Sequence, residues 1–219
     1  MENKVYKDRA DAGQVLACLL KEKEITDGII MAIPRGGVVI AAQVSETLKL
    51  PLDIIIPRKI GAPFNQEVAI GAVTQDGTVI LTENKHLMLL AGADDIDDIV
   101  QQEINEIKRR MIKYRGNTDY PDYTGKTVII IDDGIATGFT TRAAIMSIKK
   151  VINPGRTILA VPVAPAEVIQ TLCEDVDEII CPLVPELFYA VGQFYENFDQ
   201  VSDEEVVKLL HNQGQIRKT

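Results

Sequence analysis

The stretch VIIIDDGIATGFTT, residues 128–141, joins a strand pattern, two adjacent carboxylates and a small-residue turn to the start of a helix. Four consecutive β-branched residues are typical of a central strand that is apolar on both faces. The turn then lies at the carboxyl end of a strand, where open α/β folds place their ligands. A helix N-terminus presents unpaired N–H groups and the positive end of a dipole. The stretch therefore predicts an α/β fold with an anion-binding turn.

Hydrogen-bond acceptors stand at the start of this turn and hydrogen-bond donors at its end. Gly134 and Gly138 allow backbone conformations and close approaches that a side chain would block. Hydroxyl donors follow at the helix start, on Thr137, Thr140 and Thr141. Asp132 and Asp133 would repel a phosphate, so they should face sugar hydroxyls or a metal ion through water. An alternative is a capped strand–helix turn with two solvated carboxylates.

The rest of the chain repeats the alternation of strands and helices. Besides residues 127–132, four apolar runs are expected to join one parallel sheet, at residues 28–33, 52–57, 157–161 and 178–181. Helical spacing is found at residues 8–22, 38–48, 141–151 and 165–173. Two strand-like pieces, residues 67–73 and 78–81, flank an Asp-Gly pair and predict a hairpin. A long helix is expected over residues 94–114, whose charged ends we interpret as a solvated face.

Composition limits the function classes. The 219 residues, 46% apolar and 25% charged, predict a single globular domain over residues 1–219. No apolar run approaches the roughly 18 residues that span a bilayer, and no secretory signal is visible, so a cytoplasmic location without membrane partners is expected. A net charge of −9 disfavours nucleic acid as a partner, but not a small phosphorylated ligand. Cys18, Cys173 and Cys181 lack metal or disulfide spacing and are expected to be small buried hydrophobes.

The turn also resembles a known signature. Four apolar residues, two acidic residues, three variable positions and then Thr-Gly-x-Thr resemble the phosphoribosyl pyrophosphate (PRPP) signature of type I phosphoribosyltransferases. It is neither a Walker loop nor a GxGxxG turn. The resemblance implies that the backbone of residues 135–141 holds the 5′-phosphate, and that Asp132 and Asp133 bind the ribose 2′ and 3′ hydroxyls. Ala136 stands where members that act on 6-oxopurines commonly carry an acidic residue, which disfavours those acceptors.

Two other segments resemble further parts of the same family. MAIPRGG, residues 31–37, is similar to the family's pyrophosphate loop: Gly36 and Gly37 expose backbone N–H groups and Arg35 offers a planar fork of donors. The same residues also fit a plain turn. In IIPRKIGAPFNQEVAIGAV, residues 55–73, Arg58 and Lys59 match the basic position that members set against the pyrophosphate, or are exposed charges. The loop over residues 61–66 resembles a mobile loop that shields the reaction from water.

The resemblance implies an α/β, Rossmann-like, parallel-sheet core and a pentosyltransferase of nucleotide metabolism. Such an enzyme moves the 5-phosphoribosyl group from PRPP to a nitrogenous base or related acceptor, with Mg²⁺ carried mainly by the substrate and no metal ligands fixed in the protein. The predicted substrate-binding residues are Asp132, Asp133, Gly134, Ile135, Ala136, Thr137, Gly138, Phe139, Thr140, Thr141, Arg35, Gly36, Gly37, Arg58 and Lys59. Arg35 and Lys59 are also expected to stabilise the leaving group in catalysis.

Some alternatives remain open at this point. The chain would also suit a PRPP-binding regulatory protein without turnover, or a transferase whose acceptor is not a base. Residues 84–120 are interpreted as a helical insertion, and residues 182–219 as a C-terminal hood. The aromatic residues Phe188, Tyr189 and Tyr195 would either stack on a planar base or pack the C-terminus on the core. His86 and His211 are expected at the surface, and a homodimer is the commonest soluble assembly.

Overall fold

The computed structural model describes residues 6–91 and 93–212. Its body is a five-stranded, all-parallel sheet with the strand order β2-β1-β6-β7-β8. The strands are β1 (Gly28–Ala32), β2 (Leu52–Ile54), β6 (Thr127–Ile131), β7 (Arg156–Ala160) and β8 (Glu178–Ile180). Each of the five predicted apolar runs forms one of these strands, which confirms the predicted sheet.

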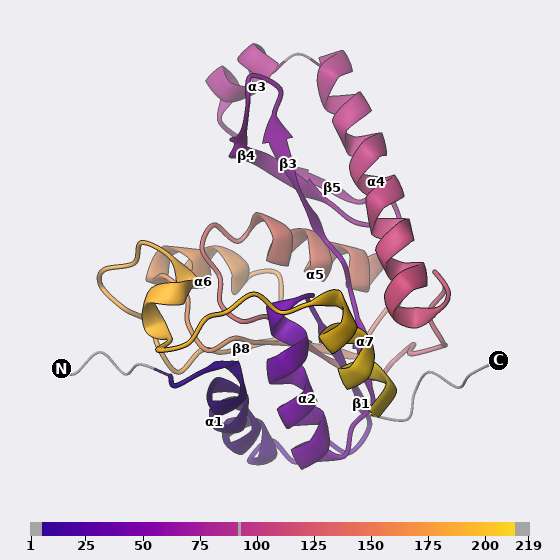
Figure 1. Ribbon diagram of the computed structural model, residues 1–219, viewed down its shortest axis with the longest axis vertical. Coiled ribbons are helices and arrows are strands. Elements are labelled where there is room, and N and C mark those ends of the chain that lie inside the picture. Colours follow the sequence, from indigo (N-terminus) through magenta and orange to yellow (C-terminus); the bar gives the residue numbers. More distant parts are fainter. Residues whose placement is uncertain (1–5, 92, 213–219) are drawn as a thin grey trace.

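Helices cover both faces of this sheet (Figure 1). One face is covered by α1 (Arg9–Lys21) and α2 (Gly36–Leu48), and the other by α5 (Phe139–Val151) and α6 (Ala166–Leu172). Helix α7 (Asp203–Asn212) packs on α2. Successive residues of β6 divide between the two layers: Ile129 and Ile131 join the first core, whereas Val128 and Ile130 join the second. This two-residue period explains why the strand is apolar throughout.

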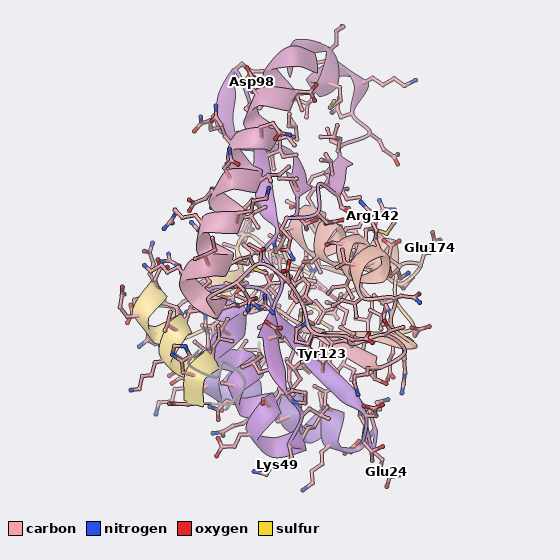
Figure 2. All side chains as sticks on the ribbon, turned by 90° about the vertical axis from the view of Figure 1, so that its right-hand side faces the viewer. Glu24, Lys49, Asp98, Tyr123, Arg142 and Glu174 are labelled. Carbon is pink, nitrogen blue, oxygen red and sulfur yellow. The ribbon has the colours of Figure 1, made fainter. Side chains whose placement is uncertain are left out.

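A smaller unit rises from the body as an arm (Figure 1). It consists of the antiparallel strands β3 (Arg58–Ala62), β4 (Asn65–Val73) and β5 (Val79–Leu81), with the helices α3 (Lys85–Ala91) and α4 (Ala93–Arg115). The buried side of α4, including Ile104, Ile107 and Met111, packs in the same core as Ile60 and Ile70 of the strands. Figure 2 places Asp98 near the outer end of this arm and Tyr123 in the body. The predicted hairpin and long helix are therefore confirmed.

Three sequence expectations need correction. Residues 61–66, interpreted as a loop, belong mostly to β3 and β4, which pair through a two-residue turn at Pro63 and Phe64. Proline and glycine suppress the strand pattern there, yet a Cβ on Gly61 would lie 2.6 Å from the carbonyl oxygen of Gln66, so the paired backbones exclude a side chain. Cys18 and Cys173 are exposed rather than buried. Helix α5 begins at Phe139, two residues before the predicted start.

Two other expectations can be compared with the described residues. His86 and His211 lie at the surface, as predicted. Within residues 6–91 and 93–212, no helix is long and apolar enough to cross a membrane.

Candidate functional site

The turn after β6 has the backbone that its glycines predict. Gly134 adopts a φ of +153° and Gly138, at the N-cap of α5, a φ of +79°, both in the region that side chains disfavour. A Cβ on Gly134 would also lie 2.5 Å from Cγ1 of Val191, because the C-terminal segment crosses the turn there. The side chain of Thr141 is buried, and its hydroxyl has no hydrogen-bond partner among the described residues. The turn therefore leads straight into a helix start with an unsatisfied donor.

Asp132 and Asp133 lie side by side at the carboxyl edge of the sheet. Oδ1 of Asp132 accepts the N–H of Asp133 at 2.8 Å, and Oδ2 of Asp133 accepts Nε of Arg9 at 2.7 Å. Burial, and then repulsion from Asp133, raises the pKa of Asp132 well above its usual range. Burial also raises the pKa of Asp133, although Arg9 opposes that shift. One guanidinium thus serves two carboxylates, and the pair retains unmet capacity for hydroxyl donors or a cation.

Arg9 is a site residue that the sequence analysis missed. Its Nη1 donates to the carbonyl of Asp199 at 2.7 Å, and its guanidinium carbon lies 3.8 Å from the ring centroid of Phe198. Tyr195 adds a second contact, since its hydroxyl donates to the carbonyl of Asp133 at 2.6 Å. Burial raises the pKa of Tyr195 above its usual range, so that hydroxyl stays protonated. Arg9 and the segment around Tyr195 therefore both contact Asp133 of the acid pair.

Two aromatic residues of the C-terminal segment take one of the two predicted roles, packing on the core. Phe194 and Tyr195 are buried, which supports packing on the core. The ring of Tyr195 lies between those of Tyr6 and Phe198, at centroid distances of 5.5 and 4.9 Å. Tyr189 is 84% exposed and remains open to a ligand.

The MAIPRGG segment packs directly against the acid pair. Strands β1 and β6 are neighbours, with Ala32 paired to Ile131, so the turns that follow them meet. A Cβ on Gly36 would lie 1.8 Å from Oδ2 of Asp133, a distance that only glycine permits. The peptide bond between Pro34 and Arg35 is cis. Arg35 is partly exposed, and its Nη1 lies 3.7 Å from Oδ1 of Asp203.

The predicted basic residues after β2 lie at the base of the arm. Arg58 pairs with Glu103 of α4, with 2.5 Å between Nε and Oε2, whereas Lys59 is exposed. Both line a cavity of about 400 Å³ whose wall also contains Pro34 of the MAIPRGG segment. The three predicted segments therefore surround one edge of the sheet, as expected for parallel strands whose carboxyl ends share that edge.

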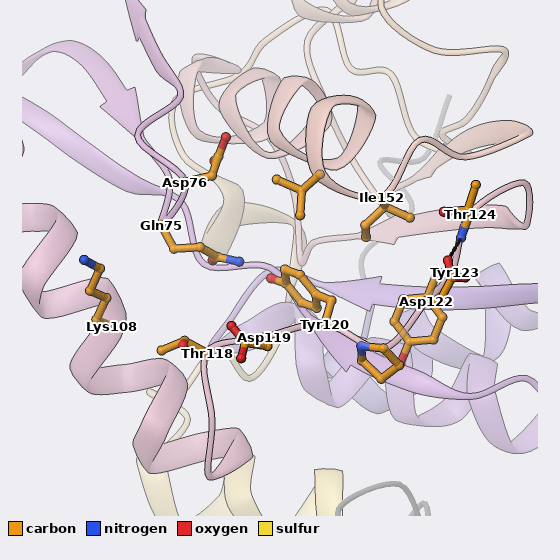
Figure 3. Close-up of a pocket in the computed structure, with 12 residues that line it drawn as sticks. Gln75, Asp76, Lys108, Thr118, Asp119, Tyr120, Asp122, Tyr123, Thr124 and Ile152 are labelled. Carbon is orange, nitrogen blue, oxygen red and sulfur yellow. Dashed lines mark hydrogen bonds between the residues drawn. The ribbon is translucent and has the colours of Figure 1, made fainter.

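Two other cavities have different linings. One, of about 350 Å³, lies on the outer side of the turn and is lined by Ala136, Thr137, Gly138 and Phe139. The other, of about 530 Å³, lies between the Asp76 turn, α4 and the loop before β6, where Figure 3 shows Gln75, Lys108 and Tyr120 around it. That cavity contains none of the predicted site residues.

Comparison with known proteins identifies the family of this chain. The phosphoribosyl transferase domain family matches residues 7–195. The chain is 37% identical over 207 residues to a Mycobacterium tuberculosis protein named "Putative phosphoribosyl transferase Rv0571c", covering 94% of this chain and 46% of that protein. It therefore spans about half the length of the curated relatives it matches. The crystal structure of TT1426 from Thermus thermophilus is 33% identical, with a TM-score of 0.78, covering 95% of this chain and 98% of that one. This chain belongs to the phosphoribosyltransferase family and has its type I fold.

Proposed function

We propose that the protein transfers the 5-phosphoribosyl group of PRPP to a nitrogenous base or a related acceptor and releases pyrophosphate. The observation that carries this proposal is the partly buried Asp132–Asp133 pair, incompletely neutralised by Arg9, beside the N-terminus of α5. A sugar phosphate meets both requirements at once, because its hydroxyls donate to the carboxylates and its phosphate accepts from backbone N–H groups.

In this proposal, each group of predicted residues binds a different part of the substrate. The amides of residues 135–141 bind the 5′-phosphate, and Asp132 and Asp133 accept the ribose hydroxyls. The bond between C1 and the pyrophosphate oxygen breaks as a bond from the acceptor to C1 forms, through a state with oxocarbenium character like that of glycoside hydrolysis. Arg35 and Lys59 offset the negative charge that grows on the departing oxygen. The electron pair of the broken bond leaves with pyrophosphate, and the acceptor loses its proton.

Magnesium fits this site as part of the substrate. Within the described residues, no group of three or more Asp, Glu, His or Cys side chains is arranged to hold an ion. Mg²⁺ prefers octahedral oxygen ligands and commonly binds through one or two carboxylates plus substrate phosphates. Asp132 and Asp133 therefore suit an ion that arrives on PRPP, directly or through water. When bound, the metal would neutralise the leaving pyrophosphate.

Turnover is the test of this proposal. The protein would be incubated with PRPP and Mg²⁺ together with each of a panel of purine, pyrimidine and pyridine acceptors, and pyrophosphate release would be followed. We expect acceptor-dependent release with at least one of them, and loss of that release in Asp133→Asn. PRPP binding without turnover across the panel would support a regulatory protein instead.

A further inference from the structure

The cavity at the base of the arm receives one of its walls from α4. This helix contributes Gln102, Glu103 and Arg110, which face Arg58 and Lys59 across the cavity. In the sequence, α4 lies within residues 84–120, which are interpreted as a helical insertion. Its contribution to a cavity that also contains Pro34 brings it next to the pyrophosphate-like loop.

Positive charge is concentrated in this cavity, although the chain has a net charge of −9. Among the side chains that the structure describes, its lining includes the three cations Arg58, Lys59 and Arg110 and one carboxylate, that of Glu103. The Arg58 and Arg110 side chains are 30% and 26% exposed, so their charges are partly withdrawn from solvent. A partly buried cluster of like charges favours a multivalent anion, because screening by water is weaker there.

The two arginines are presently held by carboxylates of α4. Arg58 pairs with Glu103, and Nε of Arg110 lies 2.7 Å from Oε1 of Glu106. A guanidinium can donate two parallel hydrogen bonds to two oxygens of either a carboxylate or a phosphate. Glu103 lines the cavity, so its carboxylate occupies a position that a phosphate oxygen would take over. Glu106 lies outside the lining and orients Arg110 before the ligand binds.

Adjacent charges on α4 differ in their surroundings. Arg109 also pairs with Glu106, at 2.7 Å, but its side chain is 58% exposed and does not line the cavity. Lys113 binds Asp203 of α7, and that carboxylate also lies near Arg35. Of the basic residues in the last three turns of α4, Arg110 is the one that lines this cavity.

We propose that Arg110 of α4 is a binding residue for the diphosphate group of PRPP and for pyrophosphate itself. The proposal deepens the function proposed above and rests on it for the identity of the substrate. A series of contacts supports it: Gly36 touches Asp133, Pro34 two residues earlier lines the cavity, and Arg110 lies in the same lining. A substrate with its ribose on the acid pair would extend its diphosphate along this path.

Calorimetric titration with inorganic pyrophosphate and Mg²⁺ tests this assignment directly. We expect Arg110→Gln to weaken pyrophosphate binding roughly tenfold or more, as expected for the loss of a charge-assisted pair. Arg110→Lys should lie between Arg110→Gln and the unchanged protein, since it keeps the charge but loses the planar fork. Arg109→Gln is the matched control: it removes the other partner of Glu106, and pyrophosphate affinity should stay within about twofold.

The outcomes separate this inference from the proposed function. If Arg110→Gln binds pyrophosphate as tightly as the unchanged protein while Asp133→Asn still weakens PRPP, the role of Arg110 is wrong and the function stands. The protein could instead bind pyrophosphate through Arg110 but neither bind nor turn over PRPP. In that case the role of Arg110 in the cavity would stand and the proposed function would be wrong. No pyrophosphate binding by the unchanged protein would overturn the inference. Thermal melting of each variant checks that it is folded.

Discussion

Two arginine–carboxylate clusters in this molecule differ in how completely they are paired. In the first, Arg115 at the end of α4 holds Asp53 of β2 through both oxygens, at 2.5 and 2.9 Å. Tyr123 also donates to Asp53, and Nη1 of Arg115 donates to Asn117 and to the carbonyl of Asp119. In the second, Arg9 faces two carboxylates and holds one oxygen of Asp133.

We interpret the first cluster as a structural anchor and propose that the second is a binding site. Side chains of Arg115 and Asp53 are 6% and 9% exposed, and their charges balance one to one. That cluster fastens the arm to the edge of the sheet. The acid pair at positions 132 and 133 is only partly buried, and two negative charges share one positive charge, which disfavours the ionised state. Such an imbalance lowers the stability of the free protein and is relieved by a ligand.

The largest effect is expected from breaking the anchor. Asp53→Asn would leave the buried guanidinium of Arg115 without a counter-charge, and the free energy of unfolding should fall by about 3–5 kcal/mol. Chemical denaturation measures it. Asp27→Asn, which removes an exposed partner of Lys126, is the control and should change stability by less than about 1 kcal/mol. Equal losses of stability in Asp53→Asn and Asp27→Asn would show that the buried pair is no more important for stability than the exposed one.

Removing a charge from the acid pair should stabilise the protein, whereas removing the charge of Asp53 should destabilise it. Asn at position 132 can still accept the N–H of Asp133 but carries no charge, so we expect a more stable protein that binds PRPP about 2 kcal/mol more weakly. In the folded protein the pKa of Asp132 is raised, so between the unfolded and folded pKa values the folded state binds more protons and stability falls as pH rises. The gain from Asp132→Asn should therefore be small near pH 4 and grow toward neutral pH. Melting curves across that range would show it, and a destabilised variant at neutral pH would refute the interpretation.

Removing the single counter-charge should shift the pH dependence of binding. Without the Arg9 guanidinium, which opposes the effect of burial, the pKa of Asp133 should rise further, so the carboxylate is lost at higher pH. Arg9→Gln should lower PRPP affinity by roughly 1 kcal/mol near neutrality, with recovery as pH increases. Arg9→Lys should restore much of the affinity. Identical affinity-versus-pH curves for Arg9→Gln and the unchanged protein would be incompatible with this role.

The smallest effect is expected at Thr141, where a buried hydroxyl has no partner among the described residues. Thr141→Val removes that unsatisfied group, so stability should rise by up to about 1 kcal/mol, while PRPP affinity falls a few-fold if the hydroxyl binds phosphate. Melting temperature and calorimetry would be measured together. Unchanged affinity would remove Thr141 from the phosphate site and leave the backbone amides as its donors.

Local patterns in the sequence predicted the sheet and the turn. Short motifs predicted strand β6 and the special backbone at Gly134 and Gly138, and the rule that parallel strands share one ligand edge places the turns after them together. The approach of Gly36 to Asp133 was found in the structure. Arg9 could not be found in that way, because 124 positions separate it from Asp133 and it sits in no motif. Strand β3 was hidden by Pro57, Gly61 and Pro63, and its order depends on pairing with β4.

The roles of the charged residues of α4 also could not be predicted from the local sequence. Arg109 and Arg110 are adjacent in a basic run, and helical spacing alone does not distinguish the exposed side chain from the one that lines a cavity. That distinction is set by how α4 packs on the strands of the arm, a contact between distant segments.

Our main proposal is that the turn after β6 binds the phosphoribosyl group through its paired aspartates. It is tested most directly by calorimetric titration of Mg²⁺-PRPP into the unchanged protein and into Asp133→Asn at neutral pH. We predict one binding site in the unchanged protein and an affinity at least roughly tenfold lower in the variant. Equal affinity in the two proteins, or no binding by the unchanged protein, would contradict the claim.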